Sequence, residues 1–532
     1  MSLTKIRRLL LKYKLTLATL AILLPIYILL YQIYIPRINA FGCFDDCNNF
    51  MRGYFFLNGN PLFSGVFSGH QPFGSYLSAI IQAVTDPASV YELILRHRQF
   101  LIGFSFIANI LLILRFGPKM IIFTVIFEFS KFYIFGDRFL GESMIIYPAV
   151  YMAGLGLYRI WGRKIYRIEY AIAAVFCWFV IFLRATYVPM ALFLFIFINW
   201  HSPIRKMPKG KVASIALFFA LSLVTILLHD IPEYFFNVVF FNFQVNIPAE
   251  TRLPMFGPKI LHWFFYPIYI FFYGEHNIFK SLLIGINITF LILFVNLLYR
   301  KRLIMATFLF LLLGVANIRT VMPGNLFLEA FHMVSWYGLL IFITLMLLFD
   351  RVENKKLFYP GALILVVSFA IFLASPDYFA KEKVDPHVEF VNNYGYILQQ
   401  GEAIKALSNP DDSLFLDGSD DLIYWQSGLF SSYKYSWYTS SMSKFDKFNI
   451  ARIEMFENDP PDFYREYGRC PKGEGVDAYY FLPTFIKDDY VRLYEDDHPS
   501  CLYIHKNKLS EVTTEQKEKA AEWLYTISDE KN

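Results

Sequence analysis

Two adjacent carboxylates, Asp45 and Asp46, follow the first long apolar stretch of the chain by about ten residues. If that stretch crosses a membrane, the pair lies near the membrane surface, where ionisable groups are costly and tend to serve a function. A carboxylate in this position can act as a general base or hold a divalent cation. The alternative is an ordinary solvated turn, and the pair alone does not separate the two interpretations.

A second set of candidate residues lies in the segment Gly136–Ser143. Arg138 and Glu142 are spaced so that they share one face if the segment is helical. Glu142 would then be an acid on the acceptor or metal side, and Arg138 would pair with a phosphate or orient a carboxylate. The alternative is a salt bridge at the end of a span, and Asp137 could take the place of Glu142.

Further cations are candidates for binding a phosphate. Arg319 lies in the segment Asn317–Pro323, before another apolar stretch. Its guanidinium would offer a planar fork to phosphate oxygens, and an anchor at the membrane interface is the alternative. Weaker candidates of the same kind are Arg184, Lys259 and His332.

The composition indicates which elements position these residues. Of the 532 residues, 56% are hydrophobic and only 17% are charged, whereas about a quarter of the residues of soluble proteins are charged. Apolar blocks recur up to residue 375, and a block of about 18 residues can cross the hydrocarbon core as a helix. The remaining sequence has the composition of a soluble protein. We therefore expect a membrane domain over residues 1–375 and a second domain over residues 376–532.

Clusters of Lys and Arg predict the direction of each span, because such clusters favour the cytoplasmic side. Basic residues precede the first apolar stretch, which is too long for the core of a signal peptide, so we expect a cytoplasmic N-terminus. The segment Ile260–Tyr273 is short and aromatic-rich, and we expect an interfacial or re-entrant helix there. With about eleven spans the tail is extracytoplasmic and the protein is a multi-pass protein of the cell membrane. The expected spans are 15–35, 100–114, 120–135, 143–158, 170–183, 185–200, 213–228, 282–298, 303–315, 332–349 and 357–374.

The cysteines agree with this topology. Four of the five, Cys43, Cys47, Cys470 and Cys501, fall in segments expected outside the cytoplasm, and Cys177 falls in a span. Two such pairs in an oxidising compartment suggest disulfides. Coincidence among so few cysteines is the alternative.

The tail alternates helical and strand-like segments, which is typical of a small α/β domain. Phe390–Leu407 has a helical pattern, and Leu422–Gly428 resembles a helix that ends at a glycine. Strands are expected at Ser413–Gly418, Ala478–Leu482 and Cys501–His505. The tail sequence contains no Gly-rich phosphate loop, no metal-spaced His cluster and no nucleophile elbow.

The loop after the first span resembles the first external loop of the GT-C superfamily of membrane glycosyltransferases, in the branch of the protein mannosyltransferases and lipid A sugar transferases. That loop opens with Asp-Glu, continues through an amphipathic helix to a Gly-x-x-Pro-like turn, and reaches a His- or Lys-Pro-Pro-Leu segment. The corresponding segments here are Asp45-Asp46, Arg52–Leu57, Asn58–Pro61 and His70–Phe73. Asp46 in place of Glu, Gln71 in place of Pro and Phe73 in place of Leu depart from the pattern.

The resemblance covers roughly the first 160 residues and implies an inverting transfer of a sugar from a polyprenyl-phosphate carrier. Asp45, or Asp46 beside it, would take the proton of the acceptor hydroxyl while the lipid phosphate leaves. The implied donor-phosphate and substrate-binding residues are His70, Arg138 and Arg319. Asp45, Asp46 and Glu142 would hold a Mg²⁺ or Mn²⁺ ion if the reaction uses one.

The implied partners are a polyprenyl-phosphate sugar donor, a glycan, lipid or protein acceptor, and membrane lipid, without nucleic acid. The C-terminal domain would cover the active face or help to bind the acceptor. A transporter or lipid flippase is the alternative, but it would need charged or broken-helix sites at mid-membrane. The expected spans are nearly free of acids apart from Glu128, which lies near Lys131. A non-catalytic assembly or sensor protein is a third class.

Overall fold

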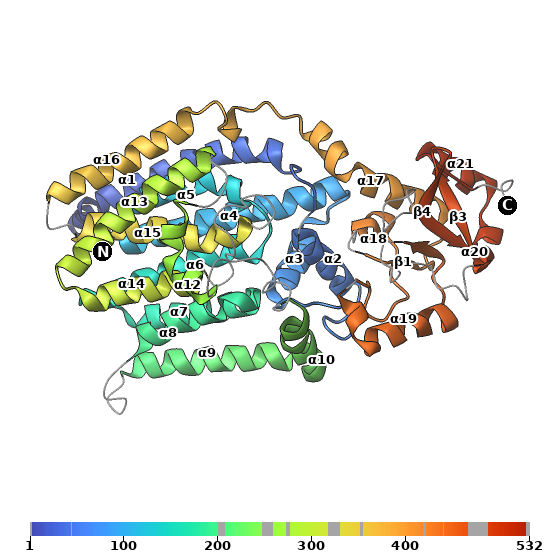
Figure 1. Ribbon diagram of the computed structural model, residues 1–532, viewed down its shortest axis with the longest axis horizontal. Helices are drawn as coiled ribbons and strands as arrows, with labels where there is room; N and C mark the ends of the chain where they lie inside the picture. The colour runs from blue at the N-terminus through green and yellow to red at the C-terminus, as the bar shows by residue number, and fades with distance from the viewer. Residues whose placement is uncertain are drawn as a thin grey trace. The chain divides into compact units, whose positions relative to one another are not determined.

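The computed structural model describes most of the chain, and its described part is mostly α-helical with a small C-terminal sheet (Figure 1). The described residues are 3–43, 45–200, 208–246, 259–272, 277–317, 330–351, 355–418, 422–439, 441–466 and 488–527. The chain divides into two compact units. The first unit comprises Met1–Pro36, Arg98–Thr225 and Pro248–Val384, and the second comprises Arg37–His97, Ile226–Ile247 and Asp385–Asn532.

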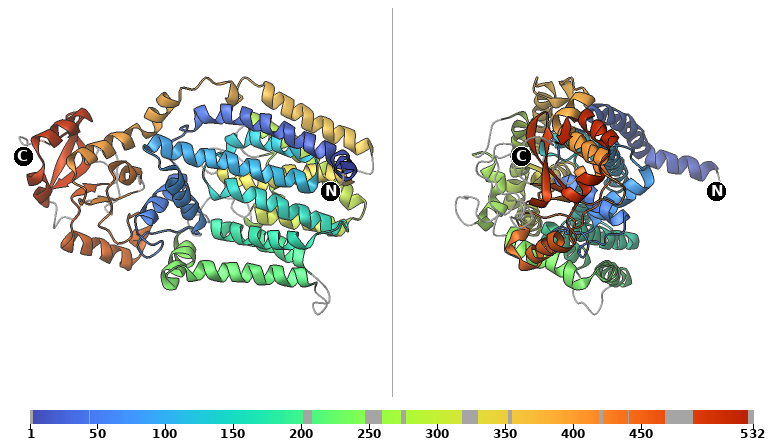
Figure 2. Two further views of the ribbon diagram at one scale, coloured as in Figure 1. Left: turned by 180° about the vertical axis from the view of Figure 1, so that it is seen from behind. Right: turned by 90° about the vertical axis from the view of Figure 1, so that its right-hand side faces the viewer.

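The first unit is a bundle of helices, and Figure 2 shows that the axes of most of them are roughly aligned. Two of them, α6 and α15, are buried along almost their whole described length and form the centre of the bundle. The helices are α1 (Leu3–Tyr34), α4 (Val90–Phe116, in this unit from Arg98), α5 (Met120–Ser130), α6 (Gly141–Ile160), α7 (Arg167–Leu183), α8 (Val188–Asn199), α9 (Lys209–Leu227), α12 (Lys259–Tyr269), α13 (Ile278–Tyr299), α14 (Leu303–Ala316), α15 (Val334–Arg351) and α16 (Lys355–Ala374). Short 3₁₀ turns join several of them at Ile35–Arg37, Lys131–Ile134, Ala185–Tyr187, Ala330–Met333 and Phe379–Lys381.

Glycines allow the central helices to pack closely. A Cβ atom on Gly338 of α15 would lie 2.4 Å from Ile146 of α6, and one on Gly154 of α6 would lie 2.3 Å from the ring of Phe116 in α4. Small residues at such contacts are the usual means by which apolar helices approach each other in a membrane. Gly154 and Gly338 therefore lie where the bundle leaves no room for a side chain.

Helices occupy all eleven stretches predicted to be spans, and α12 occupies the stretch predicted to be interfacial or re-entrant. Six helical segments in the described chain are long and apolar enough to cross a membrane, which supports the prediction of a helical membrane protein. They are Lys14–Arg37, Val90–Phe116, Lys209–Leu227, Ile278–Tyr299, Ala330–Phe349 and Phe358–Lys381. Because α5, α7, α8 and α14 have 11, 17, 12 and 14 residues, they are shorter than the about 18 residues that a span needs. The number of about eleven spans stays a prediction.

The second unit combines the first loop with the C-terminal part of the chain. Its helices are α2 (Asp45–Leu57), α3 (Phe73–Thr85), α10 (Ile231–Phe235), α17 (Pro386–Leu407), α18 (Leu422–Ser427), α19 (Asp446–Asn458), α20 (Lys506–Glu511) and α21 (Thr514–Glu522). Two π-helical turns, Phe236–Phe240 and Asn242–Asn246, follow α10. The predicted division at residue 375 assigned the first loop to the membrane domain, and it stays a prediction about domains.

The C-terminal sheet has the strand order β1-β2-β4-β3-β5. Only β1 and β2 are parallel among these strands, with Leu414 opposite Phe463, and the other neighbours are antiparallel. The strands are β1 (Leu414–Leu416), β2 (Phe463–Arg465), β3 (Tyr490–Glu495), β4 (His498–His505) and β5 (Tyr525–Ile527). The helices α17 and α18 and the strands β1 and β4 confirm four predicted tail elements, whereas the predicted strand at Ala478–Leu482 lies outside the described residues.

Candidate functional site

The acidic pair begins a helix that a disulfide holds in place. Asp45 and Asp46 occupy the first turn of α2, and the disulfide Cys43–Cys47 encloses them. The N–H groups of a first helical turn and the positive end of the helix dipole both stabilise carboxylates. Asp46 is fully buried, whereas the Asp45 side chain is 38% exposed. Only Asp45 of the pair is therefore accessible to a substrate.

The structure describes three of the four cysteines that were predicted to form disulfides, and all three are disulfide-bonded. The bond between Cys43 and Cys47 confirms the first pair. Cys501 is also disulfide-bonded, and its partner lies outside the described residues. Cys177 is free and buried.

His70 lies beside the exposed carboxylate. Its Nε2 atom is 4.0 Å from Oδ2 of Asp45, although the two residues come from opposite ends of the first-loop pattern. The close packing of α2 on α3 brings them together. A Cβ atom on Gly53 of α2 would lie 2.8 Å from the backbone nitrogen of Ala79, and one on Gly74 of α3 would lie 2.7 Å from Oδ1 of Asn49. The contact at Gly53 requires glycine, because the neighbouring backbone cannot move aside.

The C-terminal part of the second unit supports α2 from its buried side. The ring of Tyr54 stacks on that of Phe430 with centroids 5.2 Å apart, and the guanidinium of Arg52 lies 5.4 Å from the Trp437 ring. The following loop is bound to the same region, because Ser436 Oγ donates a hydrogen bond to the carbonyl of Gly65 at 2.9 Å. The tail therefore fixes the helix that presents Asp45.

The segment after His70 is tied to a group of aromatic rings. Gln71 accepts a hydrogen bond from the Tyr234 hydroxyl at 2.9 Å. His229 stacks on Tyr234 and on Tyr76, with ring centroids 5.6 and 5.8 Å apart. Burial lowers the pKa of His229 from 6.5 to about 4, so its ring is neutral at physiological pH.

The second predicted acid has a different partner from the one expected. Glu142 lies in the first turn of α6, fully buried, with Oε1 3.3 Å from Nε of Arg184. Arg138 and Glu142 do not share a helix face, because α6 begins at Gly141 and Arg138 precedes it in a turn. Arg138 is buried, with its guanidinium 5.7 Å from the Phe135 ring.

Asp137, the alternative to Glu142, faces another cation. Its Oδ2 atom lies 3.5 Å from Nη1 of Arg98 in an almost buried ion pair. The first unit therefore holds two acid–arginine pairs close to each other in sequence, and each acid is paired with an arginine from a distant segment.

Arg184 was a weaker candidate, yet it pairs with the acid at the start of α6. A Cβ atom on Gly141 would lie 3.3 Å from Cβ of Arg184, so the glycine gives the arginine room to approach. One signal in the sequence marks this residue: it is the only charged residue between Tyr170 and Trp200. A cation between two long apolar stretches needs a partner or a polar surface.

The remaining candidates are placed as follows. Arg319 lies outside the described residues, as does the side chain of Lys259. His332 is buried in the turn before α15, and its carbonyl accepts a hydrogen bond from the Tyr187 hydroxyl at 3.3 Å.

No group of three or more His, Cys, Asp or Glu side chains with metal-binding geometry occurs among the described residues. Asp45 and Asp46 belong to the second unit and Glu142 to the first. Their predicted joint binding of a cation stays a prediction.

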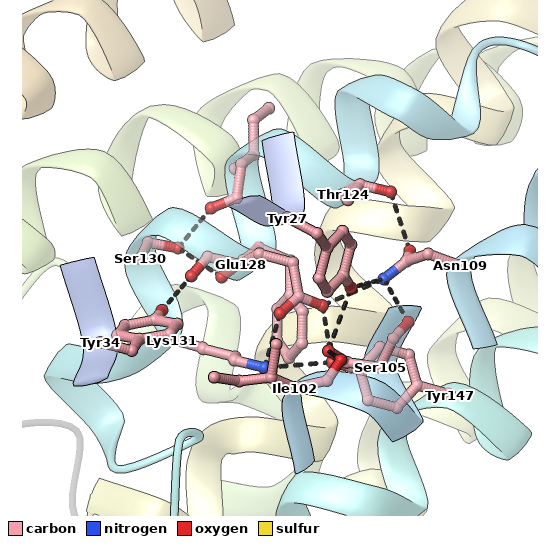
Figure 3. A network of polar contacts seen from close by, with 12 residues as sticks. Tyr27, Tyr34, Ile102, Ser105, Asn109, Thr124, Glu128, Ser130, Lys131 and Tyr147 are labelled. Atoms are coloured by element: carbon pink, nitrogen blue, oxygen red, sulfur yellow. Dashed lines mark hydrogen bonds and ion pairs between the residues drawn. The ribbon is translucent and has the colours of Figure 1, made fainter. Parts of the chain in front are cut away.

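The acid expected inside a span lies in a closed polar network in the first unit (Figure 3). Glu128 forms an ion pair of 2.5 Å with Lys131, and its Oε1 atom accepts hydrogen bonds from Tyr147 at 2.6 Å and Asn109 at 3.1 Å. Asn109 also donates to the Tyr27 hydroxyl at 2.8 Å. The network links α1, α4, α5 and α6, and both charged side chains are at most 4% exposed.

Comparison of the chain with models of protein families, with curated proteins and with solved structures finds no match. The resemblance of the first loop to the GT-C enzymes stays a prediction.

Proposed function

We propose that the chain is an integral membrane glycosyltransferase that moves a sugar from a polyprenyl-phosphate-linked donor to an acceptor outside the cytoplasm. The observation that carries the proposal is the position of Asp45 at the start of α2, 4.0 Å from His70. The two residues stand at the first and last segments of the loop pattern that resembles the GT-C enzymes. A partly exposed carboxylate next to an imidazole, close in sequence to a helix long enough to span a membrane, supports proton transfer from a hydroxyl.

In this proposal Asp45 is the general base. The acceptor oxygen attacks the anomeric carbon and gives its proton to Asp45, while the bond from that carbon to the phosphate oxygen breaks. The polyprenyl phosphate leaves with the electron pair, and the configuration at the anomeric carbon is inverted. Asp46 is a positioning residue, because full burial keeps its carboxylate from contact with an acceptor.

The leaving phosphate needs cations to stabilise its developing charge. His70, Arg138 and Arg319 are the proposed residues for this role. Glu142 is proposed as an acid on the acceptor or metal side, and its carboxylate forms an ion pair of 3.3 Å with Arg184. A Mg²⁺ or Mn²⁺ ion, if used, would be held by the exposed carboxylate of Asp45, since Mg²⁺ binds through one or two carboxylates and keeps its waters.

Transport or lipid flipping is the alternative function. It would need a charged group at mid-membrane that a substrate can reach. Glu128 does not fit the role of a substrate-binding group, because its carboxylate is already paired with Lys131 and hydrogen-bonded to Tyr147 and Asn109. We therefore favour chemistry at the membrane surface.

The cellular test compares glycans from cells that lack the protein with those from cells that regain it. The expected result is that one glycan or glycolipid is missing from the deletion strain and returns with the wild-type gene. Asp45→Asn should not restore it, although the variant reaches the membrane. Asp86→Asn is the matched control, because Asp86 is an exposed acid in the same loop with a left-handed backbone that Asn adopts readily. Restoration by Asp45→Asn as well as by the control would contradict the proposal.

A further inference from the structure

A cavity of about 770 Å³ opens at one end of the helix bundle in the first unit. The ends of α6, α8 and α13 and the start of α14 form its walls. Among its lining residues that the structure describes, four are cations and none is acidic. They are Arg159, Arg300, Lys301 and Arg302.

Three of these cations form the whole connection between two apolar helices. α13 ends at Tyr299 and α14 begins at Leu303. The N–H of Lys301 donates to the carbonyl of Leu298, and that of Arg302 to the carbonyl of Leu297, both at 2.9 Å. This is the hydrogen-bond pattern of a Schellman motif, which usually has glycine at the left-handed position. Here Lys301 holds that position, with φ of 55°. The turn therefore carries a charge where a glycine would be less strained.

The fourth cation comes from another helix and is held by backbone carbonyls. Arg159, in the last turn of α6, donates to the carbonyls of Phe197 and Ile198, the latter at 3.0 Å, near the end of α8. On the other side, α14 starts without a side-chain cap, so its first N–H groups face the turn. Cations together with a helix N-terminus favour a phosphate or another anion.

The rim of the cavity is apolar and exposed. The side chains of Trp200 and Ile304 are 63% and 75% exposed. Trp161 is a second indole in the wall, and its N–H donates to Sδ of Met305 at 3.2 Å. Tryptophans are enriched at the boundary of a membrane. An anionic group with hydrocarbon chains attached would pair its charge with the cations and pack its chains against the apolar rim.

The cavity and Glu142 lie at opposite ends of one helix. Glu142 is in the first turn of α6 and Arg159 in its last, which separates them by about 26 Å along the axis. That distance is close to the thickness of the hydrocarbon core, about 30 Å. If Glu142 lies at the outer surface, the cavity opens at the inner one, where anionic lipids give the membrane a negative potential.

We propose that this cavity binds the phosphate head group of an anionic phospholipid, with the acyl chains against Trp200 and Ile304. Arg300, Lys301 and Arg302 contact the phosphate, and Arg159 supplies positive potential from the opposite wall. This proposal does not depend on glycosyl transfer, because it concerns the other end of the bundle.

The test is titration of the purified, delipidated full-length protein with phosphatidylglycerol, observed as bound lipid by native mass spectrometry. We expect tight binding of phosphatidylglycerol, and weak binding of phosphatidylcholine and of glycerol phosphate, which lacks acyl chains. The double variant Lys301→Gly/Arg302→Gln should bind phosphatidylglycerol about 25-fold more weakly, since each cation contributes about fivefold. Glycine at the left-handed position preserves the turn, so the melting temperature should not fall.

The matched control is Lys164→Gln/Arg167→Gln. These exposed cations follow α6 at the same end of the bundle but do not line the cavity. The control should bind phosphatidylglycerol as the wild type does. Equal losses in the two double variants, equal affinity for the zwitterionic lipid, or equal binding of glycerol phosphate would each overturn the proposal.

Discussion

At the scale of single residues, the environments of Asp45 and Asp46 differ although the two are neighbours in one helical turn. Successive residues of a helix point in directions about 100° apart, so one carboxylate enters the interior while the other meets solvent and His70. The disulfide from Cys43 to Cys47 fixes the backbone around both. The account therefore assigns proton transfer to Asp45 and support to Asp46.

The disulfide should matter for activity more than for folding. Cys43→Ser opens a ring of only five residues, and loop-closure entropy predicts a loss of about 2 kcal/mol of stability. The backbone at the start of α2 would then no longer be held by the disulfide. The rate of sugar transfer should fall severalfold while the protein stays in the membrane. The rate of sugar transfer by the purified variant, compared with that of the wild type in the absence of reductant, measures this effect. Cys177→Ser is the control, because Cys177 is not in a disulfide, and an equal response of both variants would contradict the role of the disulfide.

His229 should make the second unit sensitive to acid. Its pKa is about 4 in the folded protein, whereas the ordinary pKa of an exposed histidine is 6.5, so between these pH values the unfolded chain binds a proton that the folded chain does not. Stability is then fully present above about pH 6.5 and falls as the pH decreases towards 4. His229→Gln should reduce the slope of the melting temperature against pH in this range. An unchanged slope would contradict the assignment.

The sequence did not predict which candidate side chains are buried or which residues they pair with. The acid at position 142 was recognised, but its spacing from Arg138 suggested a helical pair, and the helix begins only at Gly141. The partner, Arg184, comes from a different helix connection. Long-range contacts of this kind depend on packing, which no local pattern encodes.

At the scale of elements, four helices of the first unit share one polar network. Tyr27 of α1, Asn109 of α4 and Tyr147 of α6 all connect to Glu128 of α5. A buried charge is tolerated only when it is paired and hydrogen-bonded. The network therefore sets the register of these helices against one another.

The ion pair at the centre of this network should show strong coupling. Glu128→Leu leaves Lys131 buried without its anion, and we expect a loss of about 3–5 kcal/mol. Replacing both residues with Leu should be less damaging than either single change, because a buried pair can be exchanged for apolar residues at little net cost. Unfolding of the two single variants and the double variant measures the coupling. Additive losses would contradict it.

The positions of the helices in the first unit were predictable from apolar runs, but their lengths were not, since α4 begins at Val90 and not near residue 100. All eleven predicted stretches are helical, because an uninterrupted apolar run of this kind leaves the backbone no other partners in lipid. The turn at Arg300–Arg302 was also visible as a basic interruption. The cavity beside it was not predictable, since its other walls come from α6 and α8.

At the scale of the whole molecule, the candidate residues are divided between two compact units. The second unit holds Asp45 and His70, and the first holds Arg138 and Glu142. The sequence placed all four in one membrane domain, because they come early in the chain. The association of the first loop with the tail rests on contacts such as Tyr54 with Phe430, which are distant in sequence. In the proposed function, the C-terminal part of the chain therefore holds α2, the helix that carries the general base Asp45.

The most direct measurement is the rate at which purified protein consumes a polyprenyl-phosphate-linked sugar in the presence of membranes from the deletion strain. We expect Asp45→Asn to lower this rate by about 10²–10⁴-fold, the usual contribution of a general base, and Asp86→Asn to leave it unchanged. Donor binding should be the same in both variants. A rate for Asp45→Asn equal to that of the wild type would contradict the claim that this carboxylate carries the reaction.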